Sequence, residues 1–252
     1  MSRSLKELLA LSPPKIHYYI KPEILAYGGS LFIYGLPGTW KSWLVIDLAF
    51  CLTQGYTWLQ YPTSQAKILI IQSEQVETIY KERIEFYVKA RPELDINKVD
   101  KFIQFESDQN YRLDNISGLF KLESELKIYK PDVVIIDCLY RSVDADNGQS
   151  TDLFLGRLTR FQRELGIAFV IVHHPHQIQK DREGTTIDLG FDDMSGRTNY
   201  SRWADSILKV SYIDESAHIL NLQFQKIKND RGATNKHLKV MVDTNKLVFN
   251  LI

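Results

Sequence analysis

The sequence predicts an α/β protein with a doubly wound, mostly parallel sheet, helices on both faces, and an antiparallel β extension at the C-terminal end. From about residue 31 to residue 174, short apolar runs alternate with amphipathic stretches, which is typical of repeated strand–helix units. The run Val133–Asp137 is apolar and β-branched up to its final acid, as expected of a strand covered on both faces. After Tyr200, strand-like runs follow one another with only turns between them, which predicts hairpins.

The strand–helix units are expected in a regular order along the chain. Each helix is indicated by apolar residues spaced three and four apart, and Pro92 and Pro131 follow two of them, where a helix normally ends. Strands are expected at residues 31–34, 67–72, 102–105, 133–137 and 168–173. Helices are expected at residues 43–52, 76–90, 113–130 and 151–165.

The C-terminal part is expected to add four strands, at residues 207–213, 219–228, 238–242 and 247–251. Before them, residues 175–199 are polar, carry three glycines, and are too long for a simple connection, so they are a candidate functional loop. We therefore expect an N-terminal leader at residues 1–26 and one domain at residues 27–252.

Composition restricts the classes of function. Lysine plus arginine and aspartate plus glutamate each number 31 in 252 residues, so any nucleic-acid surface must be local rather than a global basic field. Cys51 and Cys138 both lie in apolar runs and are expected to be buried thiols of a reducing compartment. No secretory signal or bilayer-length apolar run is visible, so we expect a cytoplasmic protein without a membrane partner.

The chemistry is indicated first by residues 35–42, Gly-Leu-Pro-Gly-Thr-Trp-Lys-Ser, which we call the phosphate loop. It lies between an expected strand and an expected helix, where backbone N–H groups and the helix N-terminus bind phosphates. Lys41 would reach the β- and γ-phosphates, and the Ser42 hydroxyl would bind Mg²⁺. Trp40 replaces a glycine of the usual pattern, and its Cβ disfavours a positive φ. The expected nucleotide-binding residues are Gly35, Leu36, Pro37, Gly38, Thr39, Trp40, Lys41, Ser42 and Trp43.

Two acids follow expected strands and suit metal and base chemistry. Asp137 ends the run Val133–Asp137 and can hold the Mg²⁺ shell, although a turn or capping acid is the alternative. Glu74 follows the strand at residues 67–72 and can act as general base toward water, while the alternative is an acid placed favourably at a helix N-terminus. Glu77 suits that alternative better than Glu74 does.

Histidines end the next expected strand. His174, after His173, could sense the γ-phosphate, and a core histidine bonded to backbone is the alternative. Zinc is disfavoured because no acid or cysteine lies near this pair, or near His176, at metal-ligand spacing. The turn at residues 224–232 is rich in cations, and Lys228 and Arg231 are candidates for a cation inserted into a neighbouring subunit's site, with a solvated hairpin tip as the alternative.

Taken together, these motifs resemble the RecA-like P-loop ATPases, and most closely the RepA-type hexameric helicases of the AAA_25 group. The resemblance covers about residues 25–235 and is carried by residues 35–59, 131–139 and 165–174, with Ser195–Arg197 and Ala204–Ser206 following. It implies that ATP·Mg²⁺ is bound by Lys41, Ser42, Glu74 and Asp137, with His174 as sensor. It also implies that the loops at residues 143–151 and 175–199 hold single-stranded DNA, where Lys180, Arg182 and Arg197 offer phosphate contacts beside several acids.

By this resemblance, we expect an ATPase that forms a ring, a hexamer, and moves on single-stranded DNA as a replicative DNA helicase of a plasmid, phage or other mobile element. No primase, zinc-binding or origin-binding segment is recognisable, so a loader or replication initiator protein is an expected partner. One alternative is a recombinase or recombination mediator that forms filaments, which the short leader without a clear protomer-linking motif disfavours. Another is a nucleotide-gated signalling module without DNA activity, which the neutral charge and the acids of residues 175–199 favour.

Overall fold

The computed structural model describes residues 3–12, 16–144, 148–174, 198–230, 232 and 236–252. In these ranges the helices are α1 (Leu5–Leu9), α2 (Lys41–Gln54), α3 (Glu77–Lys89), α4 (Ile96–Phe102), α5 (Ile116–Tyr129), α6 (Leu139–Ser142), α7 (Gly148–Leu165) and α9 (Thr198–Trp203). The strands are β1 (Tyr18–Ile20), β2 (Leu25–Ala26), β3 (Ser30–Tyr34), β4 (Ile68–Gln72), β5 (Ile103–Ser107), β6 (Val133–Asp137), β7 (Ala168–His173), β8 (Ser206–Asp214), β9 (Ile219–Ile227), β10 (His237–Asp243) and β11 (Val248–Leu251).

A nine-stranded sheet forms the centre of the described chain, in the order β11-β10-β9-β8-β3-β7-β6-β4-β5. The six strands from β8 to β5 pair in parallel, and β9, β10 and β11 continue the sheet antiparallel beside β8. The predicted fold class is therefore confirmed, including the antiparallel extension. Parallel pairing also places the carboxyl ends of β3, β7, β6 and β4 at one edge of the sheet.

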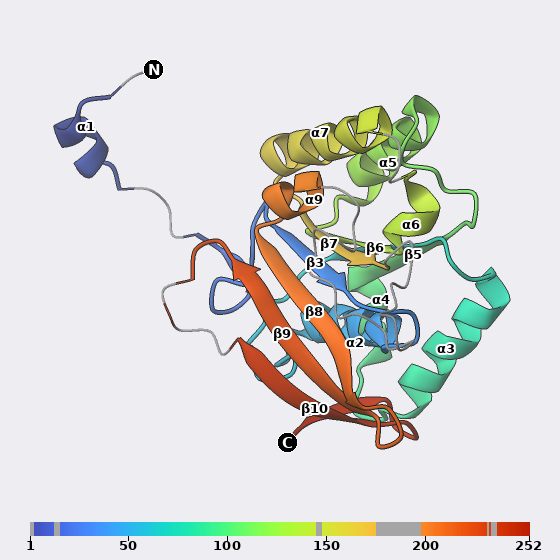
Figure 1. Ribbon diagram of the computed structural model, residues 1–252. Coiled ribbons are helices and arrows are strands. Elements are labelled where there is room, and N and C mark those ends of the chain that lie inside the picture. Colours follow the sequence, from blue (N-terminus) through green and yellow to red (C-terminus); the bar gives the residue numbers. More distant parts are fainter. Residues whose placement is uncertain (1–2, 13–15, 145–147, 175–197, 231, 233–235) are drawn as a thin grey trace, which may run out of the picture.

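Helices cover both faces of the parallel strands (Figure 1), with α2, α3 and α4 on one side and α5, α6, α7 and α9 on the other. Alternate residues of each strand point to opposite faces, so Leu31 and Ile33 of β3 join the cluster around α2, while Phe32 and Tyr34 join the cluster around α5 and α7. Burial on both faces is why β3, β4, β6 and β7 are mostly apolar. Each fully buried side chain of this kind contributes roughly 1.5–3 kcal/mol.

The segment predicted as a leader contains two different parts. Residues 18–26 form the small antiparallel pair β1–β2, and Tyr19, Ile20, Ile24 and Leu25 are buried in the cluster around α2. The short helix α1 begins with a capping box between Ser4 and Glu7, buries none of its residues, and lies apart from the body in Figure 1. Among the helices of the described ranges, none combines the length and apolar content needed to cross a bilayer.

Candidate nucleotide-binding site

The phosphate loop follows β3 at the carboxyl edge of the sheet, and α2 begins inside it at Lys41. Gly35 passes directly against β8, where an added Cβ would overlap the carbonyl oxygen of Val210. Gly38 has a φ of 82°, a conformation that favours glycine. The two glycines therefore serve different purposes, one for close packing and one for the turn. A cavity of about 260 Å³ lies beside the loop and is lined by Gly38, Thr39, Trp40, Lys41, Ser42, Trp43, Glu74, Arg83 and His174.

Lys41 is held inside the loop by two uncharged acceptors. Its Nζ atom donates hydrogen bonds to the carbonyl oxygen of Leu36 at 2.5 Å and to the hydroxyl of Thr39 at 3.0 Å. Burial lowers the pKa of Lys41 to about 7, although the carboxylates of Asp137 and Glu74 oppose that shift. A bound polyphosphate would bring negative charge next to this ammonium, so nucleotide binding and full protonation of Lys41 favour each other.

Asp137 lies at the end of β6, beside the first turn of α2. Burial raises the pKa of its carboxyl group to about 6, while a hydrogen bond from Ser42 and the charge of Lys41 act in the opposite direction. Its Oδ1 atom is buried and has no hydrogen-bond partner among the described residues. A buried carboxylate oxygen with a free lone pair, next to a hydroxyl, is the donor set that Mg²⁺ takes at a phosphate site. The residues present therefore fit the metal.

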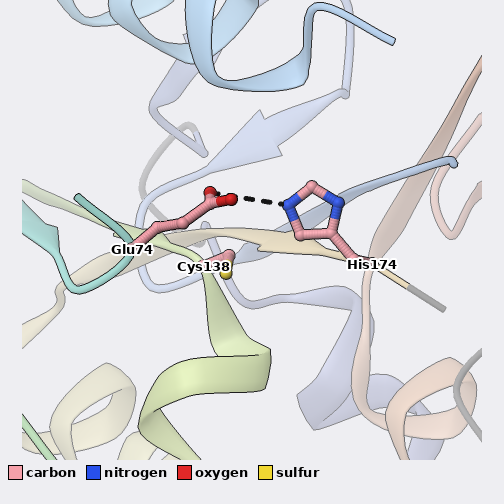
Figure 2. Close-up of side chains that lie close together, drawn as sticks. All are labelled: Glu74, Cys138 and His174. Carbon is pink, nitrogen blue, oxygen red and sulfur yellow. Dashed lines mark ion pairs between the residues drawn. The ribbon is translucent and has the colours of Figure 1, made fainter. Parts of the chain in front are cut away.

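Glu74 and His174 face each other across the mouth of the cavity (Figure 2), with 3.8 Å between the Oε2 and Nε2 atoms. Glu74 follows β4 and His174 follows β7, so the two strands that flank β6 present them at the same edge. Burial is the main cause that lowers the pKa of His174 to about 3, with Lys41 and His173 adding to it, so the ring is neutral near pH 7. His173 itself is fully buried and packs against Tyr200, with ring centroids 5.8 Å apart.

Arg83 of α3 also lines the cavity, and the sequence reasoning missed it. Its guanidinium lies over the ring of Trp43, 5.4 Å from the ring centroid. A signal was present in the sequence, because Arg83 falls three residues after Tyr80 and four before Tyr87, the two buried residues of α3. A charged side chain on the inner face of an amphipathic helix is uncommon without a partner, and here it places a second cation beside Lys41.

Residues 2–179 match the family described as AAA domain, AAA_25. The chain belongs to this family. Among solved structures it is similar to one whose title describes an ATPase domain, with a TM-score of 0.64 and 12% sequence identity over 90% of this chain and 85% of that chain. At that identity the likeness shows the fold alone, and it agrees with the mostly parallel sheet described above. A comparison with curated proteins finds no match.

Trp40 is the unusual residue of this AAA_25 domain. It occupies the position before α2 in the left-handed conformation, with a φ of 62°, even though a side chain there costs roughly 1–2 kcal/mol. Its ring packs edge-on against His218 in the β8–β9 turn, with centroids 5.7 Å apart. The neighbouring Tyr212 hydroxyl donates to the carbonyl oxygen of Gly38 at 3.1 Å. Contacts from β8 and the β8–β9 turn thus hold the loop in a conformation that glycine usually adopts.

A second hollow of about 370 Å³ continues from the phosphate cavity and shares Trp40, Trp43 and Arg83 with it. Its remaining lining comes from Ile79, Glu82 and Phe86 of α3 and from Thr244 and Leu247 of the β10–β11 turn. The two hollows differ in character, since the first is polar and charged and the second is mainly aromatic and aliphatic. A ligand with a charged end and a flat apolar end matches this pair.

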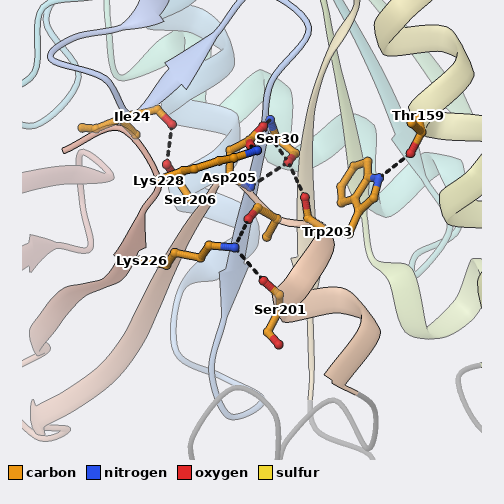
Figure 3. A network of polar contacts seen from close by, with 10 residues as sticks. Ile24, Ser30, Thr159, Ser201, Trp203, Asp205, Ser206, Lys226 and Lys228 are labelled. Atoms are coloured by element: carbon orange, nitrogen blue, oxygen red, sulfur yellow. Dashed lines mark hydrogen bonds and ion pairs between the residues drawn. The ribbon is translucent and has the colours of Figure 1, made fainter.

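Lys228 lies at the opposite edge of the sheet from the phosphate loop. Its Nζ atom pairs with Asp205 at 3.0 Å, and Asp205 in turn accepts hydrogen bonds from the backbone N–H and hydroxyl of Ser30, the first residue of β3 (Figure 3). The nearby Lys226 donates to the carbonyl oxygens of Ser201 and Ala204 around α9. The structure therefore does not bring Lys228 to the cavity of its own subunit.

The remaining candidates for function fall elsewhere. Arg231, the second candidate for a cation inserted into a neighbour, and the candidate DNA contacts Lys180, Arg182 and Arg197 all lie outside the described residues. The structure thus brings together the phosphate loop, Lys41, Ser42, Glu74, Asp137 and His174, and adds Arg83 to them.

Proposed function

We propose that this AAA_25 protein hydrolyses ATP and uses the reaction to move along single-stranded DNA as a ring-forming motor, a RepA-like replicative helicase of a plasmid, phage or other mobile element. The observation that supports this most directly is the meeting of Lys41, Glu74 and His174 around one cavity at the carboxyl edge of the parallel strands, with the carboxyl group of Asp137 close enough to act on Lys41. This is the edge at which open α/β sheets bind their ligands.

Binding would use both hollows. The backbone N–H groups of residues 35–42, Lys41 and Arg83 would hold the phosphates, and the aromatic hollow between Trp43 and Phe86 would take the nucleoside. Ser42 and Asp137 would hold Mg²⁺, which neutralises phosphate charge when bound. Because Trp40 and Trp43 line the site, nucleotide binding should change the tryptophan fluorescence.

Hydrolysis would need a base and an orienting group. Glu74 is exposed at the cavity mouth, where a water molecule can approach both its carboxylate and a γ-phosphate, and it would accept the proton of that water. The neutral His174 ring, 3.8 Å from Glu74, would hold that carboxylate in place and register the presence of the γ-phosphate. Both residues end strands of the rigid sheet, so their separation is set by the fold.

A second subunit would complete the site. The position of Lys228 at the amino edge of the sheet supports a role in trans rather than in cis, and Arg231 follows it three residues later. In a ring of identical subunits, a hexamer in our proposal, one subunit's edge can face the next subunit's cavity. The loops at residues 143–151 and 175–199, with Lys180, Arg182 and Arg197, would contact DNA, and a loader or initiator protein would place the ring on it.

Steady-state ATPase measurements with and without single-stranded DNA test the proposal. Lys41→Ala should abolish nucleotide binding. Glu74→Gln should retain binding and lose about 10²–10⁴-fold in rate, the usual contribution of a general base. Glu77→Gln is the matched control, because Glu77 lies at the start of α3 and not in the cavity lining.

The outcomes separate the alternatives. DNA stimulation together with rings in negative-stain images and strand separation supports the motor. DNA stimulation with filaments and no strand separation would indicate a recombinase or mediator instead. Hydrolysis that DNA does not change, with no salt-dependent DNA binding, would indicate a signalling module.

A further inference from the structure

Three different metal-binding side chains meet at the mouth of the phosphate cavity. The thiol of Cys138, a carboxylate oxygen of Glu74 and a ring nitrogen of His174 all lie within 4.8 Å of one another. They come from the ends of β6, β4 and β7, three consecutive strands of the sheet (Figure 2). The sequence disfavoured a zinc site because no partner lies near the histidines in the chain, whereas the fold supplies two partners from other strands.

The spacing suits a tetrahedral metal ion. Bonds of roughly 2.0–2.3 Å place the ligand atoms of a zinc site about 3.3–3.8 Å apart. The Glu74 Oε2 and His174 Nε2 atoms are already 3.8 Å apart, and the Cys138 thiol lies within 4.8 Å of a ligand atom of each residue, so the side chains need to move closer to close the set. Neither ring nitrogen of His174 has a hydrogen-bond partner among the described residues, which leaves the ring available as a ligand.

The chemistry of the donors distinguishes this cluster from the magnesium position. A sulfur, a nitrogen and an oxygen donor favour zinc, cobalt or a similar ion, while Mg²⁺ takes oxygen donors only. The oxygens of Ser42 and Asp137 therefore suit Mg²⁺, whereas the sulfur of Cys138 suits zinc or cobalt. The two acids, Asp137 and Glu74, offset the positive charge of Lys41 near the cluster.

We propose that Glu74, Cys138 and His174 form a site for a thiophilic divalent metal ion such as zinc, and that a metal ion bound there stops hydrolysis. Three protein ligands leave a fourth position for water, so the site remains open. Occupancy would withdraw both Glu74 and His174 from the attacking water. Binding of the metal does not depend on the function proposed above, but the inhibition does.

The two cysteines of the chain provide a matched pair of variants. Cys138 is buried in the cluster, and Cys51 lies in α2 without a place in it. Co²⁺ titrated into the metal-free protein should bind one ion per subunit and produce near-ultraviolet thiolate-to-cobalt absorption. Cys138→Ser should abolish this absorption. It should also weaken Zn²⁺ binding, measured by calorimetry, by at least about 10–100-fold, because even the loss of a residue that only hydrogen-bonds to a metal ligand has an effect of that size. Cys51→Ser should leave both unchanged.

His174→Gln provides a second ligand test in case the serine variant does not fold, and circular dichroism checks both. In ATPase assays, micromolar Zn²⁺ should inhibit the wild type and Cys51→Ser, and inhibit Cys138→Ser at least about tenfold less. Absent cobalt–thiolate absorption, or equal Zn²⁺ binding by the wild type and Cys138→Ser, would overturn the inference. Cobalt–thiolate absorption in a protein that does not hydrolyse ATP would support the metal site and refute the proposed function instead.

Discussion

The unfolding free energy of Asp137→Asn, relative to that of the wild type, should rise with pH in the ligand-free protein, even though the substitution removes a proposed metal ligand. Burial raises the pKa of Asp137 from 3.8 to about 6, so the folded protein binds this proton more tightly than the unfolded chain does. The stabilisation that this proton provides is therefore fully present below the unfolded pKa of 3.8, and it is lost as the pH rises through the folded pKa near 6. A shift of about 2 pKa units corresponds to about 3 kcal/mol, at about 1.4 kcal/mol per unit.

The amide of the variant adds a cost of its own, about 1–3 kcal/mol for a buried N–H group without a partner, but that cost does not change with pH. The quantity to follow is therefore how the difference in unfolding free energy between variant and wild type changes with pH. Measured by urea unfolding from about pH 4.5 to pH 8, it should move in favour of Asp137→Asn by about 2 kcal/mol, since the first part of the loss occurs below that range.

The exposed Asp100 gives the control, because Asp100→Asn makes the same chemical change without removing a buried charge. A flat difference for Asp137→Asn, within about 0.5 kcal/mol over the whole range, would refute the reasoning that a desolvated charge is stored at the end of β6. In the presence of Mg²⁺ and nucleotide, the wild type should regain stability and the variant should not, since only the carboxylate can use the metal.

Three further pairs of substitutions test the packing of the domain. Gly35→Ala should lower the unfolding free energy by about 1–3 kcal/mol, because the new Cβ overlaps a backbone oxygen of β8. Gly156→Ala, in open space on α7, should raise the unfolding free energy by about 0.5–1 kcal/mol. Equal effects of the two variants in urea unfolding would contradict this packing. Lys226→Met should lower the unfolding free energy by about 2 kcal/mol, because two carbonyl oxygens lose a charged donor. Lys228→Met removes only an exposed ion pair and should lower the unfolding free energy by under about 1 kcal/mol. The reverse ranking in urea unfolding would count against these contacts. At position 40, Trp40→Gly should be more stable to thermal unfolding than Trp40→Ala by about 1 kcal/mol, since only alanine keeps the left-handed strain, and equal stability would mean that the strain is absent.

Much of the fold could be predicted from the sequence because four of the parallel strands, β3, β4, β6 and β7, are mostly apolar and buried on both faces. The runs at β3, β4, β6 and β7 were located within a residue or two, as was the antiparallel extension. The pair β1–β2 was missed because its strands are only three and two residues long, too short for a period to show. The sequence also could not give the order of strands in the sheet, which depends on how the helices pack.

The site was predictable where its residues are adjacent in sequence or end a recognisable strand, as with Lys41, Ser42 and Asp137. It was not predictable where a helix returns a side chain to the cavity, as α3 does with Arg83, or where strand order decides the neighbours, as with Cys138. Cys138 was expected to be a buried thiol, and it is only 1% exposed, but nothing in its local sequence indicates Glu74 and His174 beside it. Cys51 is less deeply buried than expected.

Strand β9 has a mechanical consequence. It begins next to His218, whose ring rests on Trp40 of the phosphate loop, and it ends next to Lys228, which pairs with Asp205 at the far edge of the sheet. Nine residues of extended chain span about 30 Å, and a strand bonded on both sides hardly shortens under load. Strand β9 therefore connects the two ends of the domain physically, and a displacement of the phosphate loop would be transmitted along it to the edge that carries Asp205 and Lys228.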